Sequence, residues 1–123
     1  MIFNDICIIT RNVPVLAKFY EAIFNAKAEG DNIHCFINAA GLKIAIYDKR
    51  AAETDMGFDF SGAGTGMITI GFNVDDVDVE YERIKKLNIS GTTEPQLWPW
   101  GAKSFRFRDL DGNIIVFRSP QSV

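Results

Sequence analysis

The residue types that most often carry catalysis are scarce in this chain and are not arranged for it. Histidine occurs once, at His34, and the two cysteines, Cys7 and Cys35, lie in no CxxC or histidine-rich pattern. A serine or cysteine nucleophile needs a base within hydrogen-bond reach, and His34 alone would have to be that base. The sequence therefore predicts no Ser-His-Asp or Cys-His centre, and we expect both thiols to be buried packing residues rather than a disulfide or a metal pair.

A second set of side chains is suited to binding a ligand. Trp98 and Trp100 flank a proline. Exposed indoles offer flat platforms for planar or cationic ligands, although one or both can instead pack on strand ends. Arg106 and Arg108 can neutralise an anionic ligand, although Arg108 can equally form a local ion pair with the adjacent Asp109. Asp5 can pair with an arginine or with a cationic group. These residues favour a site for a small organic molecule, and they leave the sign of its charge open.

The elements that must position these side chains occur twice along the chain. Residues 5–13 form an alternating run and a polar joint that lead into a helical run, and residues 69–77 repeat this order 64 residues later. Repetition at such a period usually means that neither copy buries its apolar face alone. We therefore expect two modules that pair around a shared surface, with the site between them.

Hydrophobic alternation and helical spacing predict the elements of each module. In the first, Asn12 is the expected helix cap, and the elements are a strand at 3–10, a helix at 13–24, a short strand at 27–29 and a hairpin of strands at 33–38 and 42–47. In the second, Asp75 or Asp76 caps the helix, and the elements are strands at 67–74, 92–96, 102–108 and 114–119 with a helix at 77–87. Each module is therefore βαβββ.

The length of the chain fits one domain made of these two modules, at about 1–50 and 67–123. A chain of 123 residues can bury one core of average size. Residues 48–66 lack clean periodicity and are rich in glycine, so we interpret them as the connection between the modules. Within it, Phe58 and Phe60 either tuck under a sheet edge or cover a pocket.

Composition narrows the possible partners. The net charge is −3, the pI is about 5.1, and lysine and arginine are scattered, which argues against a nucleic-acid surface. No apolar run approaches the roughly 20 residues that span a bilayer, and the first residues lack the basic region of a signal peptide. We expect a cytoplasmic protein that binds a small molecule and neither nucleic acid nor membrane.

The stretch from Trp98 to Asn113, with the sequence WPWGAKSFRFRDLDGN, resembles a known signature. It is similar to the PWG…F…DPDGN pattern of the bleomycin-resistance-like branch of the vicinal oxygen chelate superfamily, which also includes glyoxalase I, extradiol dioxygenases and fosfomycin-resistance proteins. Leu110 stands where that pattern has proline. The resemblance covers most of the chain. It implies an α+β fold in which two paired βαβββ modules form a curved mixed sheet around a cup, and it implies a homodimer.

The resemblance also assigns four positions to a divalent metal in metal-dependent members. Here they hold Asp5, Ala45, Thr69 and Val116. A divalent cation needs converging nitrogen or oxygen donors, and alanine and valine have none. We therefore expect no metal and no cofactor, and no glyoxalase or dioxygenase chemistry that depends on a metal to polarise the substrate.

Strand alternation predicts the lining of the cup once one residue is oriented. If Thr69 points into the cup, so do Gly71 and Asn73, while Ile70 and Phe72 face the helix. The other expected lining residues are Asp5, Cys7, Ile9, Lys43, Ala45, Tyr47, Ser104, Arg106, Arg108, Ile114, Val116 and Arg118. From this lining and the preceding loop, the predicted ligand-binding residues are Asp5, Cys7, Tyr47, Thr69, Asn73, Trp98, Trp100, Arg106 and Val116.

Three functions remain open from the sequence. The leading hypothesis is a metal-free binding protein of the bleomycin-resistance type that sequesters an aromatic or amphipathic compound, antibiotics included. The second is an enzyme of the same superfamily, a glyoxalase-like lyase or isomerase or a dioxygenase relative, which would have to use Asp5 or Tyr47 without a metal or bind a metal through Asp5 and further residues. The third is a regulatory module whose cup is filled by its own side chains.

Overall fold

The computed structural model describes residues 2–62, 64 and 68–120, and it falls into two compact units. These are Met1–Ala63 and Gly64–Val123, and each is described by itself. Of the helices in the described part of the chain, none has the length and apolar character needed to cross a membrane.

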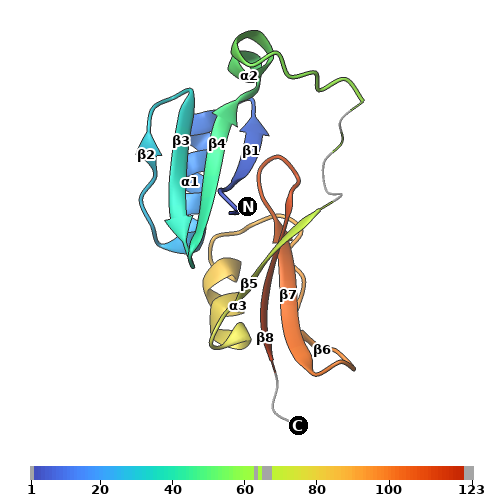
Figure 1. Cartoon of the computed structure of the whole chain (residues 1–123). Coiled ribbons are helices and arrows are strands. Elements are labelled where there is room, and N and C mark those ends of the chain that lie inside the picture. Colours follow the sequence, from blue (N-terminus) through green and yellow to red (C-terminus); the bar gives the residue numbers. More distant parts are fainter. Residues whose placement is uncertain (1, 63, 65–67, 121–123) are drawn as a thin grey trace. The chain divides into compact units, whose positions relative to one another are not determined.

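Unit one is a four-stranded mixed sheet with a long helix on one face (Figure 1). The strand order is β1-β4-β3-β2; β1 runs parallel to β4, and the other pairs are antiparallel. The elements are β1 (Ile6–Thr10), α1 (Val13–Phe24), β2 (Glu29–Gly30), β3 (His34–Ala39), β4 (Leu42–Asp48) and α2 (Lys49–Asp55).

Helix α1 has clear start and stop signals and one apolar face. The Asn12 side chain accepts a hydrogen bond from the Val15 N–H at 3.2 Å, and Asn25 ends the helix in the left-handed conformation. The buried residues recur at helical spacing and pack against the sheet, where α1 contacts β3 and β4. They are Val13, Leu16, Ala17, Tyr20 and Ile23.

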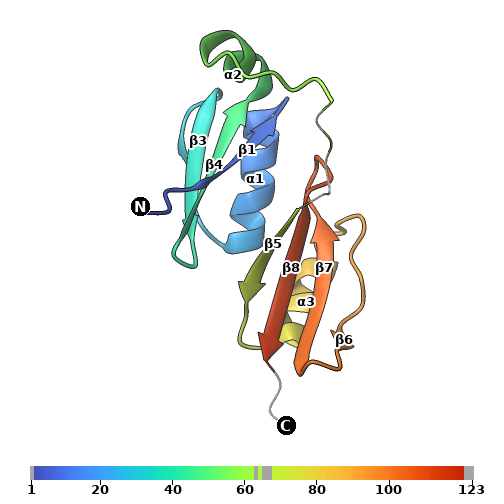
Figure 2. The ribbon, with the colours of Figure 1, turned by 45° about the vertical axis from the view of Figure 1, so that its right-hand side comes forward.

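Unit two repeats this arrangement with the strand order β5-β8-β7-β6. Figure 2 shows α1 and α3 each lying behind its own sheet. The elements are β5 (Thr69–Asn73), α3 (Val77–Lys85), β6 (Gln96–Leu97), β7 (Ala102–Arg108) and β8 (Ile114–Pro120). Asp76 caps α3 by accepting from the Asp78 and Val79 N–H groups at 3.0 and 3.2 Å. The core between sheet and helix is aromatic, with edge-to-face contacts among Phe72, Phe105, Phe107 and Phe117.

The α+β class and the βαβββ order of each module are confirmed, and the boundaries of α1 and β7 match those predicted. Other boundaries were wrong: the first strand begins at Ile6 rather than at residue 3, the helix expected at 77–87 ends at Lys85, and the strand expected at 92–96 is reduced to β6. Residue 67 lies outside the described residues. The pairing of the two modules around a cup stays a prediction.

Helix α2 was missed, because its seven residues lie in the segment interpreted as a connection. Its N-cap is Asp48, whose carboxylate accepts the Ala51 N–H at 3.0 Å. Only Ala52 is buried, so the helix carries no apolar periodicity for a sequence pattern to detect. Beyond it, Phe58 and Phe60 meet edge to face at 6.0 Å, with Phe58 exposed.

Candidate functional site

Each sheet has one face covered by its helix and one face that the helix leaves uncovered. We call these uncovered surfaces open face one and open face two. Strand alternation and register assign their residues. Open face one consists of Cys7, Ile9, Glu29, His34, Phe36, Asn38, Lys43, Ala45 and Tyr47, and Asp5, just before β1, continues the alternation of Cys7 and Ile9. Open face two consists of Thr69, Gly71, Asn73, Gln96, Trp98, Ser104, Arg106, Arg108, Ile114, Val116 and Arg118.

Open face one is an aromatic surface with mixed charge. Tyr47 pairs with His34 across the β3–β4 ladder, and their ring centroids are 5.3 Å apart. One rung away, the Lys43 ammonium lies 4.6 Å from the centroid of the Phe36 ring, within cation–π range. Ala45 lies at the centre of the face between these groups. The face can therefore contact a ring system and can donate hydrogen bonds from Tyr47 and Lys43.

The two cysteines lie on opposite faces of the same sheet, which corrects the expectation that both are buried. Cys35 is buried under the helix, whereas Cys7 is exposed on open face one. The pKa of the Cys7 thiol is raised, first by partial desolvation and second by the negative charge of Asp5. A raised pKa keeps Cys7 a neutral thiol at neutral pH, so it is suited to packing against a ligand rather than to nucleophilic attack.

Open face two is basic and rigidly arranged. Arg118 donates from Nη1 to the Asn73 side-chain oxygen at 2.7 Å, and Arg108 donates from Nη1 to the Gly112 carbonyl at 2.8 Å. Arg106 is exposed on β7 opposite Val116. These contacts fix two guanidinium groups on the strands and leave the third free to meet a ligand.

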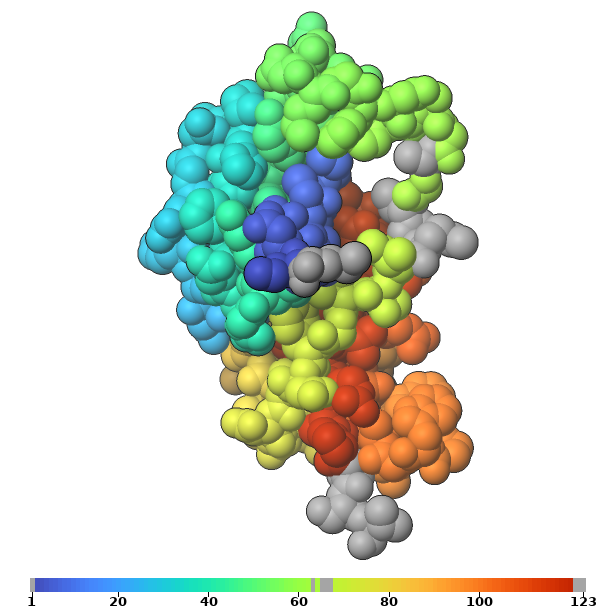
Figure 3. Space-filling model, viewed as in Figure 1, coloured from blue at the N-terminus to red at the C-terminus, as the bar shows by residue number. Residues whose placement is uncertain are grey.

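The two indoles stack on each other at the tip of the β6–β7 hairpin, the orange region that protrudes in Figure 3. Their ring centroids are 5.1 Å apart with an interplanar angle of 5°. Trp98 is half-buried, and its Nε1 donates to the Ser104 hydroxyl at 2.8 Å, whereas Trp100 is 72% exposed. Gly101 closes the turn with φ 86° and an N–H bond to the Trp98 carbonyl at 3.0 Å. The stack therefore presents one exposed indole plane beside open face two.

The four positions that resemblance assigns to a metal do not fit one. Ala45 on β4 and Val116 on β8 carry hydrocarbon side chains, and Thr69 supplies only a neutral hydroxyl. In the described part of the chain, no three histidine, cysteine or acidic side chains are grouped closely enough to hold a metal ion. Asp5 alone is a good donor, so no chemical step can be assigned to a metal at this position.

His34, Phe36 and Arg118 are part of these faces, although they were not among the predicted binding residues. The length of the hairpin loop between β3 and β4 is the sequence signal that could have placed His34 and Phe36. Ala39 pairs with Leu42, so the loop is the two residues Ala40 and Gly41, both with positive φ. A two-residue loop fixes the register of a hairpin and sets His34 opposite Tyr47.

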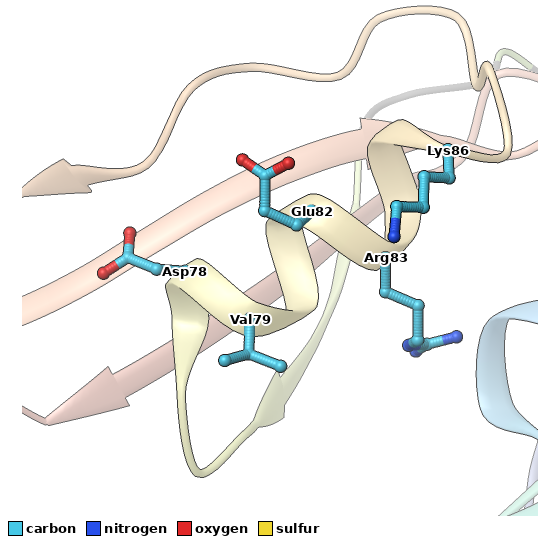
Figure 4. A pocket seen from close by; sticks show the side chains of 5 residues that line it. All are labelled: Asp78, Val79, Glu82, Arg83 and Lys86. Carbon is cyan, nitrogen blue, oxygen red and sulfur yellow. The ribbon is translucent and has the colours of Figure 1, made fainter.

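Two surface depressions in the described residues each lie on the helix side of their own unit, away from its open face. One, of about 510 Å³, is on the outer side of α3 and is lined by Asp78, Val79, Glu82, Arg83 and Lys86 (Figure 4). Two of its charged groups have partners, since Asp78 pairs with Lys103 at 2.7 Å and Arg83 pairs with Glu80 at 2.8 Å. The other, of about 460 Å³, surrounds the end of α1 near Asn25. Neither includes a predicted binding residue.

The sequence pattern that defines the Glyoxalase/Bleomycin resistance protein/Dioxygenase superfamily matches residues 2–117. The chain belongs to this superfamily. The match spans both units, so the superfamily accounts for the repeat and for the βαβββ order in each module. A comparison with curated protein sequences found no match.

Solved structures of the superfamily share the fold at low sequence identity. A glyoxalase/bleomycin resistance protein/dioxygenase from Nocardioides is 16% identical with a TM-score of 0.85, covering 99% of this chain and 85% of that one. A lactoylglutathione lyase from Agrobacterium tumefaciens is 19% identical with a TM-score of 0.74, covering 96% and 92%. A bleomycin-binding protein complexed with bleomycin is 18% identical with a TM-score of 0.67, covering 98% and 100%.

Proposed function

We propose that this superfamily member is a metal-independent protein that binds an aromatic or amphipathic small molecule, antibiotics included, on its open faces. The observation that carries the proposal is the composition of these faces. They hold ring systems and hydrogen-bond donors around hydrocarbon side chains at Ala45 and Val116. Such a mixture of apolar surface and a few polar groups is typical of small-molecule sites.

Each part of the predicted site has a role in this proposal. At open face two, the indole plane of Trp100 would stack on a flat ligand, and Thr69 and Val116 would contact its apolar part. At open face one, Tyr47 would donate a hydrogen bond to a ligand, and the neutral thiol of Cys7 would pack against it. The bleomycin-binding protein complexed with bleomycin supports the proposal, since it has the same fold and holds a small molecule. We further propose a cytoplasmic homodimer, and light scattering of the purified protein tests the dimer.

The first test is thermal stability against a panel of divalent metals, cationic antibiotics, flat aromatic compounds and glutathione conjugates. A ligand at about 100 times its Kd adds about 2.7 kcal/mol to the free energy of unfolding, which raises the Tm of a domain of this size by several degrees. We expect organic compounds to raise the Tm and metals to leave it unchanged. Stabilisation by metals alone would overturn the proposal.

A matched pair of variants shows whether the ligand uses the indole platform. Trp100→Ala removes an exposed ring, and Leu97→Ala removes a side chain of comparable exposure, 62%, from the opposite side of the same hairpin. We expect Trp100→Ala to abolish most of the stabilisation by the ligand and Leu97→Ala to preserve it. Equal effects would show that the ligand does not contact the stack.

A glyoxalase-like enzyme is the second candidate, favoured by the likeness to the lactoylglutathione lyase fold. Without a metal, such an enzyme would have to move protons with Asp5 or Tyr47. An assay with methylglyoxal and glutathione separates the two candidates. Turnover that is lost in Asp5→Asn would replace the binding proposal, and the absence of turnover together with ligand stabilisation would support it.

A further inference from the structure

Open face two carries three arginines and, among its described residues, no acidic side chain. Arg106 and Arg108 lie on β7, and Arg118 lies on the neighbouring strand β8. The acid nearest to the face along the chain, Asp109 after β7, is buried, and its carboxylate accepts hydrogen bonds from Asp111 and Asn113. Among the described residues, no ion pair joins an acid to any of the three arginines. The face therefore has a local charge of opposite sign to the net charge of the chain.

The hydrogen bonds of these arginines hold them in place without neutralising them. Arg118 is held by an amide oxygen, that of Asn73, and Arg108 by a main-chain carbonyl, that of Gly112. Both acceptors are neutral. A guanidinium that donates to a neutral oxygen keeps its full charge and has donors left over, since it carries five N–H groups.

The sheet register places two of the arginines near one another on open face two. Arg106 pairs with Val116, and Arg118 pairs with Ser104, so the two arginines are diagonal neighbours on the same face. Diagonal positions are about 7 to 8 Å apart between backbones, within reach of long side chains. Arg118 donates to Asn73 on β5, and its other N–H groups and those of Arg106 can donate charge-assisted hydrogen bonds to a carboxylate placed between them.

An aromatic surface lies directly beside this pair. The hydroxyl of Ser104, across the ladder from Arg118, accepts the hydrogen bond from Trp98, and Trp98 stacks on Trp100. Open face one offers no comparable cationic cluster, because its Lys43 is accompanied by the acids Asp5 and Glu29. A ligand with an acidic end and a planar end would match the order of groups along open face two.

We infer that the ligand is an aromatic carboxylate, whose anionic end lies between Arg106 and Arg118 and whose ring lies against the indole stack. This inference rests on the proposed binding function and specifies the charge of its ligand, which the sequence left open. It excludes the cationic ligands that a net charge of −3 would otherwise favour.

Three compounds with the same ring test the inference: naphthoate, the neutral naphthamide and the cationic naphthylmethylammonium. Calorimetric titration of the full chain gives a Kd for each. We expect naphthoate to bind at least about tenfold more tightly than naphthamide, and the ammonium compound to bind more weakly still. Added salt should weaken the binding of naphthoate and leave that of naphthamide nearly unchanged.

Two variants connect this selectivity to open face two. Arg106→Gln removes a charge from the face, and Arg50→Gln removes the same charge from helix α2 of unit one, where Arg50 is exposed. We expect Arg106→Gln to raise the Kd of naphthoate about tenfold and to leave the Kd of naphthamide unchanged, whereas Arg50→Gln should change neither Kd. Arg118→Gln should have the same effect as Arg106→Gln, and circular dichroism verifies that each variant is folded.

Each other outcome is decisive. If naphthamide or the ammonium compound binds as tightly as naphthoate, the inference that the ligand is anionic is overturned. The proposed binding function then still stands. An equal loss in Arg106→Gln and Arg50→Gln would show a general charge effect and would overturn the role of the face. If none of the three compounds binds, the inference fails for aromatic acids, and the wider ligand panel decides the proposed function separately.

Discussion

The two units share one architecture on their helix sides and differ on their open faces. On the helix side of the central strands, Ile44 and Ile46 of unit one correspond to Ile115 and Phe117 of unit two, and all four are buried. On the open side, Tyr47 of β4 corresponds to Arg118 of β8. The helix side is restricted by packing, whereas the open side is free to diverge, so the chemical difference between the two units lies there.

Substitutions on the two faces of one strand test whether only the helix side is restricted by packing. Phe107 is fully buried on β7, and its neighbour Arg106 is exposed on open face two. We expect Phe107→Ala to lower the free energy of unfolding by about 3 to 5 kcal/mol, because it leaves a cavity in an aromatic cluster. Arg106→Ala should change it by less than about 0.5 kcal/mol. Urea denaturation measures both, and a comparable loss from Arg106→Ala would show that open face two is also a packing surface.

The two cysteines test the same difference between the helix side and the open side within unit one. Iodoacetamide should modify Cys7 at least about tenfold faster than Cys35, because only Cys7 is exposed. Since the pKa of Cys7 is raised, its thiolate fraction is small at neutral pH, and its rate should keep rising above the ordinary thiol pKa of about 8.5. Mass spectrometry of the peptides measures both rates, and Cys7→Ser should remove the fast reaction. A Cys7 that reacts no faster than Cys35 would mean that open face one is covered in solution.

The N-caps of α1 and α3 test whether the helix sides of the two units are stabilised alike. The expected change in the free energy of unfolding is the smallest of the three predictions. Asp76 accepts two N–H bonds at the start of α3, and Asn12 accepts one at the start of α1. We expect Asp76→Ala and Asn12→Ala each to lower the free energy of unfolding by about 1 kcal/mol. Asp75→Ala, which removes an exposed neighbour outside the helix, is the control and should change it by less than about 0.5 kcal/mol. An equal loss from Asp75→Ala would indicate a general charge effect instead of a cap.

The repeated elements could be predicted because their signals are local. The alternation of Ile70 and Phe72 with polar residues, and the helical spacing of Leu16, Tyr20 and Ile23, each arise from burial on one face. Helix α2 gave no such signal, since it buries a single alanine. Its existence depends on a capping bond from Asp48, which propensity alone does not reveal.

The candidate site was less accessible to prediction because it depends on pairing between strands. Alternation placed Cys7 on the side away from the helix, but the expectation that it is buried was wrong, since the pattern of one strand does not show that β1 is an edge strand. The partnership of His34 with Tyr47 and that of Arg118 with Asn73 join residues from different strands. The sequence identified the chemical types on the two faces, and the ladders show which of them are neighbours.

The two-residue loop at Ala40 and Gly41 limits how open face one can evolve. A slip of β3 by one position against β4 would turn Cys35 and Ile37 outward and His34 and Phe36 into the core. The short loop and the buried side chains together select one register, whereas a substitution along the strand leaves that register unchanged. Open face one can therefore acquire new side chains one at a time, but it cannot acquire a new register.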